Sequence, residues 1–157
     1  MAQAVEAART VILTVDDDPG VSRAVARDLR RRYGQSYRIV RAESGESALG
    51  ALRELKLRGD LVAVILADYR MPQMTGIEFH DNVKHAFPDQ AAQIIFITGG
   101  AFTAGAQRFL DAVANRKLQK PFHTEQLLAA VDALIDGPGA PSRSGQAASR
   151  ASHRHHA

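Results

Sequence analysis

The sequence predicts a doubly wound α/β fold, in which helices cover both faces of a five-stranded parallel sheet. Short apolar segments alternate five times with longer amphipathic segments, a pattern typical of strands joined by crossover helices. Residues 61–67 are apolar at every position, which indicates a parallel strand buried on both faces. We therefore expect strand order 2-1-3-4-5, with the first and third strands flanking the point at which the winding reverses.

The first strand and helix are defined by signals at their boundaries. Residues 11–15 are rich in Val, Ile and Leu, which predicts a buried strand. Asp18 then precedes Pro19. This pair predicts a helix start, because the carboxylate can accept hydrogen bonds from free amides while proline suits the first turn. Apolar residues recur at helical spacing as far as Gly34, where we expect the helix to end.

The remaining elements alternate in the same way. Residues 37–41 alternate between polar and apolar types, as in an edge strand. Residues 69–76 contain a proline and a glycine, so the chain turns just after Asp68. Further strands are expected at residues 94–97 and 117–119, and helices at residues 44–59, 77–87, 103–114 and 127–135.

The composition is that of one soluble domain. A chain of 157 residues with 45% hydrophobic content can bury a core. It has no membrane-spanning apolar run, no signal peptide and no cysteine, so we expect a cytoplasmic protein without a membrane partner. We divide the chain into a flexible N-terminus at residues 1–9, a globular domain at residues 10–136 and a disordered, weakly basic tail at residues 137–157.

The net charge of +3 arises in the tail. Residues 137–157 contain three arginines and no acidic residue. Setting these three aside from the 20 basic residues leaves 17, equal to the number of acidic residues. A weakly basic tail is a poor basis for specific nucleic-acid binding, so we predict no nucleic-acid partner. The first helix carries four arginines that we interpret as a solvated face: Arg23, Arg27, Arg30 and Arg31.

Polar residues from four strands meet at one edge of the predicted sheet. Parallel strands place their carboxyl ends at the same edge, where open α/β sheets bind ligands. The residues at these ends are Asp16, Asp17, Asp68, Thr98 and Lys120. Carboxylates gathered in this way repel one another unless a cation neutralises them or a pKa rises. Hard oxygen ligands without His or Cys indicate Mg²⁺ as that cation.

Lys120 and Thr98 complete a site suited to phosphoryl transfer. Lys120 supplies a positive charge and Thr98 a hydroxyl donor, and both can stabilise a phosphoryl group in transfer. The nucleophile is then the carboxylate of Asp68, and the product is an aspartyl phosphate. An aspartate at a strand end is usually a cap or a solvated turn residue, but Asp68 is predicted to lie beside Asp16, Asp17 and Lys120, which favours a functional role.

Four motifs occur in a set order: residues 15–19 (Val-Asp-Asp-Asp-Pro), Asp68 with Met71, Pro72 and Gly76, residues 97–99 (Ile-Thr-Gly), and residues 120–122 (Lys-Pro-Phe). In this order and at these separations they resemble the receiver domain of two-component response regulators, over residues 10–136. The resemblance implies a flavodoxin-like fold and a phosphoprotein of phosphorelay signal transduction.

The resemblance also implies a metal site and a phosphoryl site. It makes Asp68 the phosphoacceptor and Asp17 a direct Mg²⁺ ligand. It gives Asp16 a mainly water-mediated metal contact and Arg70 a metal contact through its backbone carbonyl. The phosphoryl contacts are Thr98 and Lys120, and the peptide bond between Lys120 and Pro121 is expected to be cis.

One position departs from the family pattern. Receivers usually have an aromatic residue three positions before the lysine, and this aromatic swings inward as the threonine moves. This chain has Lys117 there, and a charged side chain does not readily bury in that slot. We therefore expect phosphorylation to be signalled through other movements of residues 99–107 and the fourth helix. Phe102 is one conceivable substitute for the missing aromatic residue.

The resemblance implies particular partners. They are a histidine kinase or histidine phosphotransfer protein and an unknown downstream protein, and a homodimer stays open. The stretch through Phe79 resembles receivers fused to thioredoxin-reductase-like flavoproteins, whereas residues 98–122 resemble receivers of hybrid histidine kinases. We expect no DNA-binding or catalytic output domain within this polypeptide, and no turnover of a free substrate.

Two alternatives stay open. The first is an interaction module of the same fold that is not phosphorylated, although such a module has no physical reason to gather three carboxylates. The second is a magnesium-dependent phosphatase that acts through an aspartyl intermediate. This phosphatase ranks lower, because Arg70 stands where such enzymes need a second carboxylate as general acid.

Overall fold

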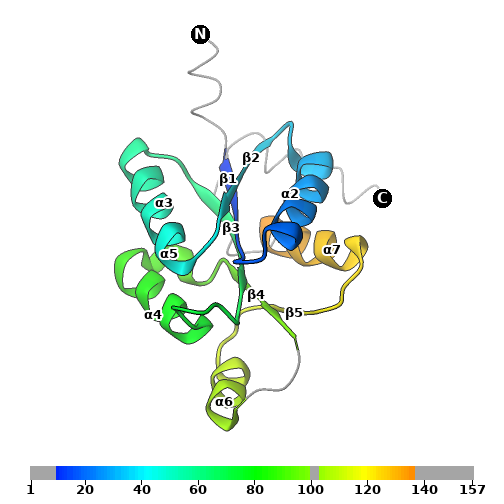
Figure 1. Ribbon diagram of the computed structural model, residues 1–157. Helices are drawn as coiled ribbons and strands as arrows, with labels where there is room; N and C mark the ends of the chain where they lie inside the picture. The colour runs from blue at the N-terminus through cyan, green and yellow to red at the C-terminus, as the bar shows by residue number, and fades with distance from the viewer. Residues whose placement is uncertain (1–9, 100–102, 137–157) are drawn as a thin grey trace.

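The computed structural model describes residues 10–99 and 103–136. The expected N-terminal segment, the tail and Phe102 lie outside these residues. The described strands form one parallel sheet in the order β2-β1-β3-β4-β5, which confirms the predicted topology (Figure 1). They are β1 (Thr10–Val15), β2 (Tyr37–Ala42), β3 (Val62–Asp68), β4 (Ile94–Thr98) and β5 (Lys117–Gln119).

Helices cover both faces of the sheet (Figure 1). On one face lie α2 (Pro19–Tyr33) and α7 (Thr124–Ile135). The other face carries α3 (Gly45–Arg58), α4 (Gly76–Ala86), α5 (Pro88–Ala91) and α6 (Ala104–Ala112). Among the described helices, none combines the length and apolar character that a membrane crossing requires.

The core has two layers because successive strand residues point to opposite faces. In β1, Leu13 packs with α3 and α4, whereas Ile12 packs with α2 and α7. Both side chains are fully buried, as is Ile65 of β3. Burial of one such side chain contributes about 1.5–3 kcal/mol. The two layers hold the strand ends, and hence the residues that follow them, in fixed positions.

The helix starts follow the predicted caps. The Asp18 carboxylate accepts hydrogen bonds from the amides of Gly20 at 2.9 Å and Val21 at 3.2 Å, which confirms its capping role. Gly59 ends α3 with a φ of 79°, a left-handed conformation that favours glycine. Gly34 follows α2 but keeps a right-handed conformation, with a φ of −60°.

Several element boundaries differ by a few residues from the sequence prediction, and two of these differences have a clear physical reason. Leu61 was expected in the central strand, but β3 begins at Val62 and Leu61 is 43% exposed. Leu61 lies before the part of the sheet that helices cover, so its apolar side chain alone did not predict its burial correctly. The third helix was expected to end at residue 87 with no helix directly after it, but Pro88 begins the short helix α5. Proline suits this position because the first helical turn needs no amide donor from it.

Candidate functional site

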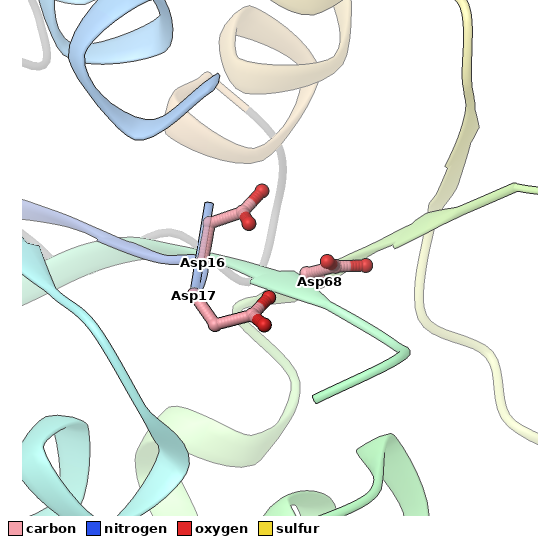
Figure 2. Close-up of side chains that lie close together, drawn as sticks. All are labelled: Asp16, Asp17 and Asp68. Carbon is pink, nitrogen blue, oxygen red and sulfur yellow. The ribbon is translucent and has the colours of Figure 1, made fainter. Parts of the chain in front are cut away.

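Three carboxylates meet at the carboxyl edge of the sheet (Figure 2). Asp16 and Asp17 follow β1, and Asp68 is the last residue of the neighbouring strand β3. One oxygen from each side chain lies within 4.8 Å of the others. Asp16 and Asp68 are buried, whereas Asp17 is exposed. The predicted gathering of these acids is therefore present, and it opens to solvent on the Asp17 side.

Lys120 reaches the same carboxylates from the other side of β4. Its Nζ lies 3.7 Å from Asp16 Oδ2 and 3.6 Å from Asp68 Oδ2. These distances exceed that of a direct hydrogen bond, so the attraction is mainly electrostatic. The backbone amide of Lys120 donates to the Thr98 carbonyl at 2.7 Å, which ties the lysine to the end of β4. The Lys120–Pro121 bond is cis, as expected.

Backbone amides orient the two buried carboxylates. The Asp18 amide donates to Asp16 Oδ1 at 2.9 Å, and the Arg70 amide donates to Asp68 Oδ1 at 3.3 Å. Each acid therefore uses one oxygen to fix its own turn. These two bonds were not predicted from the sequence, although an acid two residues before a turn amide is a known signal for them.

Burial and mutual repulsion raise the pKa of both buried acids. Loss of solvation raises the pKa of Asp16, and the Asp18 amide and Lys120 oppose this effect. Loss of solvation also raises the pKa of Asp68, and the negative charge of Asp16 raises it further. Lys120 again acts in the opposite direction. One lysine thus compensates the site only partly, and a further cation would relieve the remaining repulsion.

The donor set fits a hard divalent cation. Asp16 Oδ2 is buried and accepts no hydrogen bond from any residue in ranges 10–99 and 103–136. A buried carboxylate oxygen without a donor is costly unless a cation or water contacts it. The other nearby ligands are also carboxylate oxygens, which are the groups that Mg²⁺ prefers. The residues present therefore fit Mg²⁺.

Thr98 and Gly99 lie at the end of β4, and Arg70 follows the end of β3. Thr98 is buried and ends β4, one residue beyond Ile97, which pairs with Asp68. A Cβ atom at Gly99 would lie 3.3 Å from the Cβ of Lys120, so glycine leaves that side chain room. Arg70 is exposed just after Asp68. Each predicted site residue thus lies at this edge of the sheet.

Lys117 is exposed, as its charge predicted. Its Nζ donates to the Val113 carbonyl at 2.9 Å, next to the end of α6. This role was not anticipated from the sequence. The ring of Tyr69 lies 6.2 Å from that of Phe109 on α6, measured between centroids.

Comparison with known proteins identifies the family. The model of the response regulator receiver domain matches residues 12–132. The chain belongs to this family. As a receiver domain, it is a module that accepts a phosphoryl group in two-component signalling. Receiver domains bind Mg²⁺ at an acidic cluster, and the cluster of Asp16, Asp17 and Asp68 corresponds to it.

Curated relatives of this receiver include both long and short proteins. It is 33% identical over 127 residues to the DNA-binding response regulator MtrA of Mycolicibacterium smegmatis, covering 81% of this chain and 51% of that protein. It is 28% identical over 128 residues to a probable chemotaxis protein CheY of Rhizobium etli, covering 82% of this chain and 95% of that protein. The chain thus spans about half the length of MtrA but nearly all of that CheY.

Solved structures show the same fold. Vibrio cholerae CheY4 superposes on this receiver with a TM-score of 0.63 and 26% identity, over 81% of this chain and 99% of that one. A two-component transcriptional regulator AraC from Clostridium phytofermentans gives a TM-score of 0.65, also at 26% identity, over 80% and 92%. These similarities agree with the flavodoxin-like topology described above.

Proposed function

We propose that this receiver accepts a phosphoryl group on Asp68 from a phosphohistidine of a histidine kinase or a histidine phosphotransfer protein. One observation carries the proposal. The carboxylate of Asp68 lies within 4.8 Å of two other acids and 3.6 Å from the Lys120 ammonium, at a sheet edge that opens to solvent beside Asp17. A nucleophile, a metal-binding set and a fixed positive charge thus occupy one place.

The transfer is a substitution at phosphorus. An oxygen of Asp68 attacks the phosphorus atom, and the new O–P bond forms as the P–N bond to the imidazole breaks. The imidazole leaves with the electron pair and takes a proton from solvent. The Lys120 ammonium balances the negative charge on the phosphoryl oxygens, and the Thr98 hydroxyl donates a hydrogen bond to one of them.

Mg²⁺, when bound, neutralises the acids and aligns the phosphoryl oxygens with the attacking carboxylate. Asp17 and Asp68 would hold it directly, Asp16 through water, and Arg70 through its backbone carbonyl. Burial and the negative charge of Asp16 raise the pKa of Asp68, and a bound cation would oppose both effects and favour the ionised nucleophile.

The phosphorylated domain signals by contact with another protein and returns to its resting state by hydrolysis. Water attacks the phosphorus, the Asp68 carboxylate leaves, and inorganic phosphate is released. Arg70 is exposed beside the acceptor, so its long side chain is placed to affect the approach of water. The domain modifies only itself and turns over no free metabolite, and we place it in the cytoplasm.

Phos-tag electrophoresis tests the proposal. Wild-type protein treated with acetyl phosphate and Mg²⁺ should give a retarded band, and EDTA should prevent its formation. Asp68→Asn should give no retarded band, whereas Asp111→Asn, at an exposed aspartate on α6, should behave as wild type. Absence of a retarded band from folded wild-type protein would support an unphosphorylated interaction module instead.

A further inference from the structure

Four arginines line an open hollow where α2 leads into β2. This turn lies at the end of the sheet opposite to the strand ends that carry the acids (Figure 1). α2 begins beside the acids at Asp18 and runs to the amino edge of the sheet, where a short turn leads into β2. The hollow at this turn has a volume of about 730 Å³. Its arginines are Arg30, Arg31, Arg32 and Arg38.

The positive charge of this hollow is only partly compensated. Arg32 Nη2 lies 2.8 Å from Asp132 Oδ2, and Arg38 Nη1 lies 3.9 Å from Asp60 Oδ2. Within residues 10–99 and 103–136, no carboxylate forms an ion pair with Arg30 or Arg31, and both are exposed. An excess of positive charge therefore faces solvent inside the hollow.

The helix dipole accounts for part of this arrangement. Basic residues are favourable in the last turn of a helix, and three of the arginines lie in the last turn of α2. Arg38 lies outside the helix, on β2, and still lines the same hollow. Helix stability therefore does not explain why arginines from both α2 and β2 line the same concave surface.

We propose that this hollow binds a compact anion that carries several phosphate groups, such as a short polyphosphate chain. Guanidinium groups donate paired hydrogen bonds that match phosphate oxygens. The volume falls in the range of small-molecule sites, about 300–1,000 Å³. A concave surface favours a compact anion over a flat protein partner. This proposal is independent of phosphorylation at Asp68.

Isothermal titration calorimetry with sodium tripolyphosphate in EDTA tests the inference, since EDTA removes any metal that could draw the anion to Asp17. Wild-type protein should bind one tripolyphosphate, and orthophosphate should bind at least about tenfold more weakly. Arg30→Ala with Arg31→Ala should lower the affinity at least about tenfold, because two charged hydrogen-bond donors are lost. The matched control removes the same charge from α2 outside the hollow, with Arg23→Ala and Arg27→Ala, and should change the affinity less than about twofold.

A second variant separates specific binding from general charge. Arg30→Lys with Arg31→Lys keeps the charge but loses the paired donors, and should also weaken binding clearly, with circular dichroism confirming the fold. Absence of tripolyphosphate binding to wild type overturns the proposal. Equal losses in the two alanine pairs indicate diffuse attraction and overturn it as well. If wild type binds a single-stranded oligonucleotide more tightly than tripolyphosphate, and both double-alanine variants lose that binding, the proposal is also overturned. The surface of α2 would then be assigned to nucleic acid.

Discussion

The Lys120 ammonium lies 3.6 Å from the Asp68 carboxylate. Asp68 ends β3 and Lys120 comes after β5, and β4 lies between these two strands in the sheet. The lysine follows β5 and its side chain spans the end of β4, where its amide is bound to the Thr98 carbonyl. The position of this charge depends on the strand order. The strand order therefore brings the ammonium of Lys120 close to Asp68, which distinguishes it from an exposed lysine elsewhere on the domain.

Replacement of Lys120 by methionine should slow phosphorylation of Asp68 by acetyl phosphate by about a hundredfold or more, because the ammonium stabilises charge on the transferred group. The rate of appearance of the retarded Phos-tag band measures this effect. Lys84→Met, at an exposed lysine on α4, is the matched control and should leave the rate unchanged. An unchanged rate in Lys120→Met would remove this lysine from the site.

Asp68→Asn should stabilise the metal-free protein. The substitution keeps the size of a buried side chain and removes one of the charges that repel each other at the site. We expect a higher free energy of unfolding for the variant than for wild type in EDTA, measured by urea denaturation. Addition of Mg²⁺ should raise the stability of wild type more than that of the variant. A less stable variant in EDTA would show that the acids do not repel as described.

The contribution of the two buried acids to the stability of metal-free wild type should fall as the pH rises through the acidic range. The folded-state pKa values of Asp16 and Asp68 are raised, so the native state binds these protons more tightly than the unfolded chain does. Their contribution is fully present below the ordinary carboxyl pKa and is lost as the pH rises through the raised values. Urea unfolding in EDTA at a series of pH values should show a shallower decline for Asp68→Asn than for Asp111→Asn.

Gly76→Ala should destabilise the domain by about 1–3 kcal/mol, the usual range for overpacking. A Cβ at this position would overlap Cδ2 of Tyr69, whose ring packs against that of Phe96 in the sheet and that of Phe109 on α6. Gly50→Ala, inside α3, is the matched control, since its Cβ would meet only Arg53 Nη2 at 3.8 Å. That control should be stabilising by up to about 1 kcal/mol. Equal stability of the two variants in urea denaturation would contradict this packing.

Lys117→Ala should loosen α6 without altering phosphorylation of Asp68. The substitution removes the hydrogen bond to the Val113 carbonyl, worth about 0.5–1.5 kcal/mol. Amide hydrogen exchange in residues 104–113 should become about twofold to tenfold faster. Lys84→Ala should leave the exchange of α6 as it is in wild type. An unaffected α6 in Lys117→Ala would show that the lysine does not cap this helix.

The alternation of apolar and amphipathic segments was enough to predict the strand order and the common edge for Asp16, Asp68 and Lys120. This worked because parallel strands joined by right-handed crossovers leave few possible arrangements. The prediction was wrong at Leu61 and incomplete at Pro88. At both positions, the outcome depended on which neighbouring elements cover the residue, and a local pattern does not contain that information.

The fold class, the family and the chemical types of the residues gathered at the acidic site can be derived from the order of amino acids alone. Three features became known only from the packed structure: the Asp16 oxygen that lacks a donor, the carbonyl that Lys117 binds, and the position of Arg38 with the arginines of α2 around one hollow. The physical reason is that composition and periodicity fix which face of an element is buried. The distance between two side chains depends instead on how separate elements pack against each other.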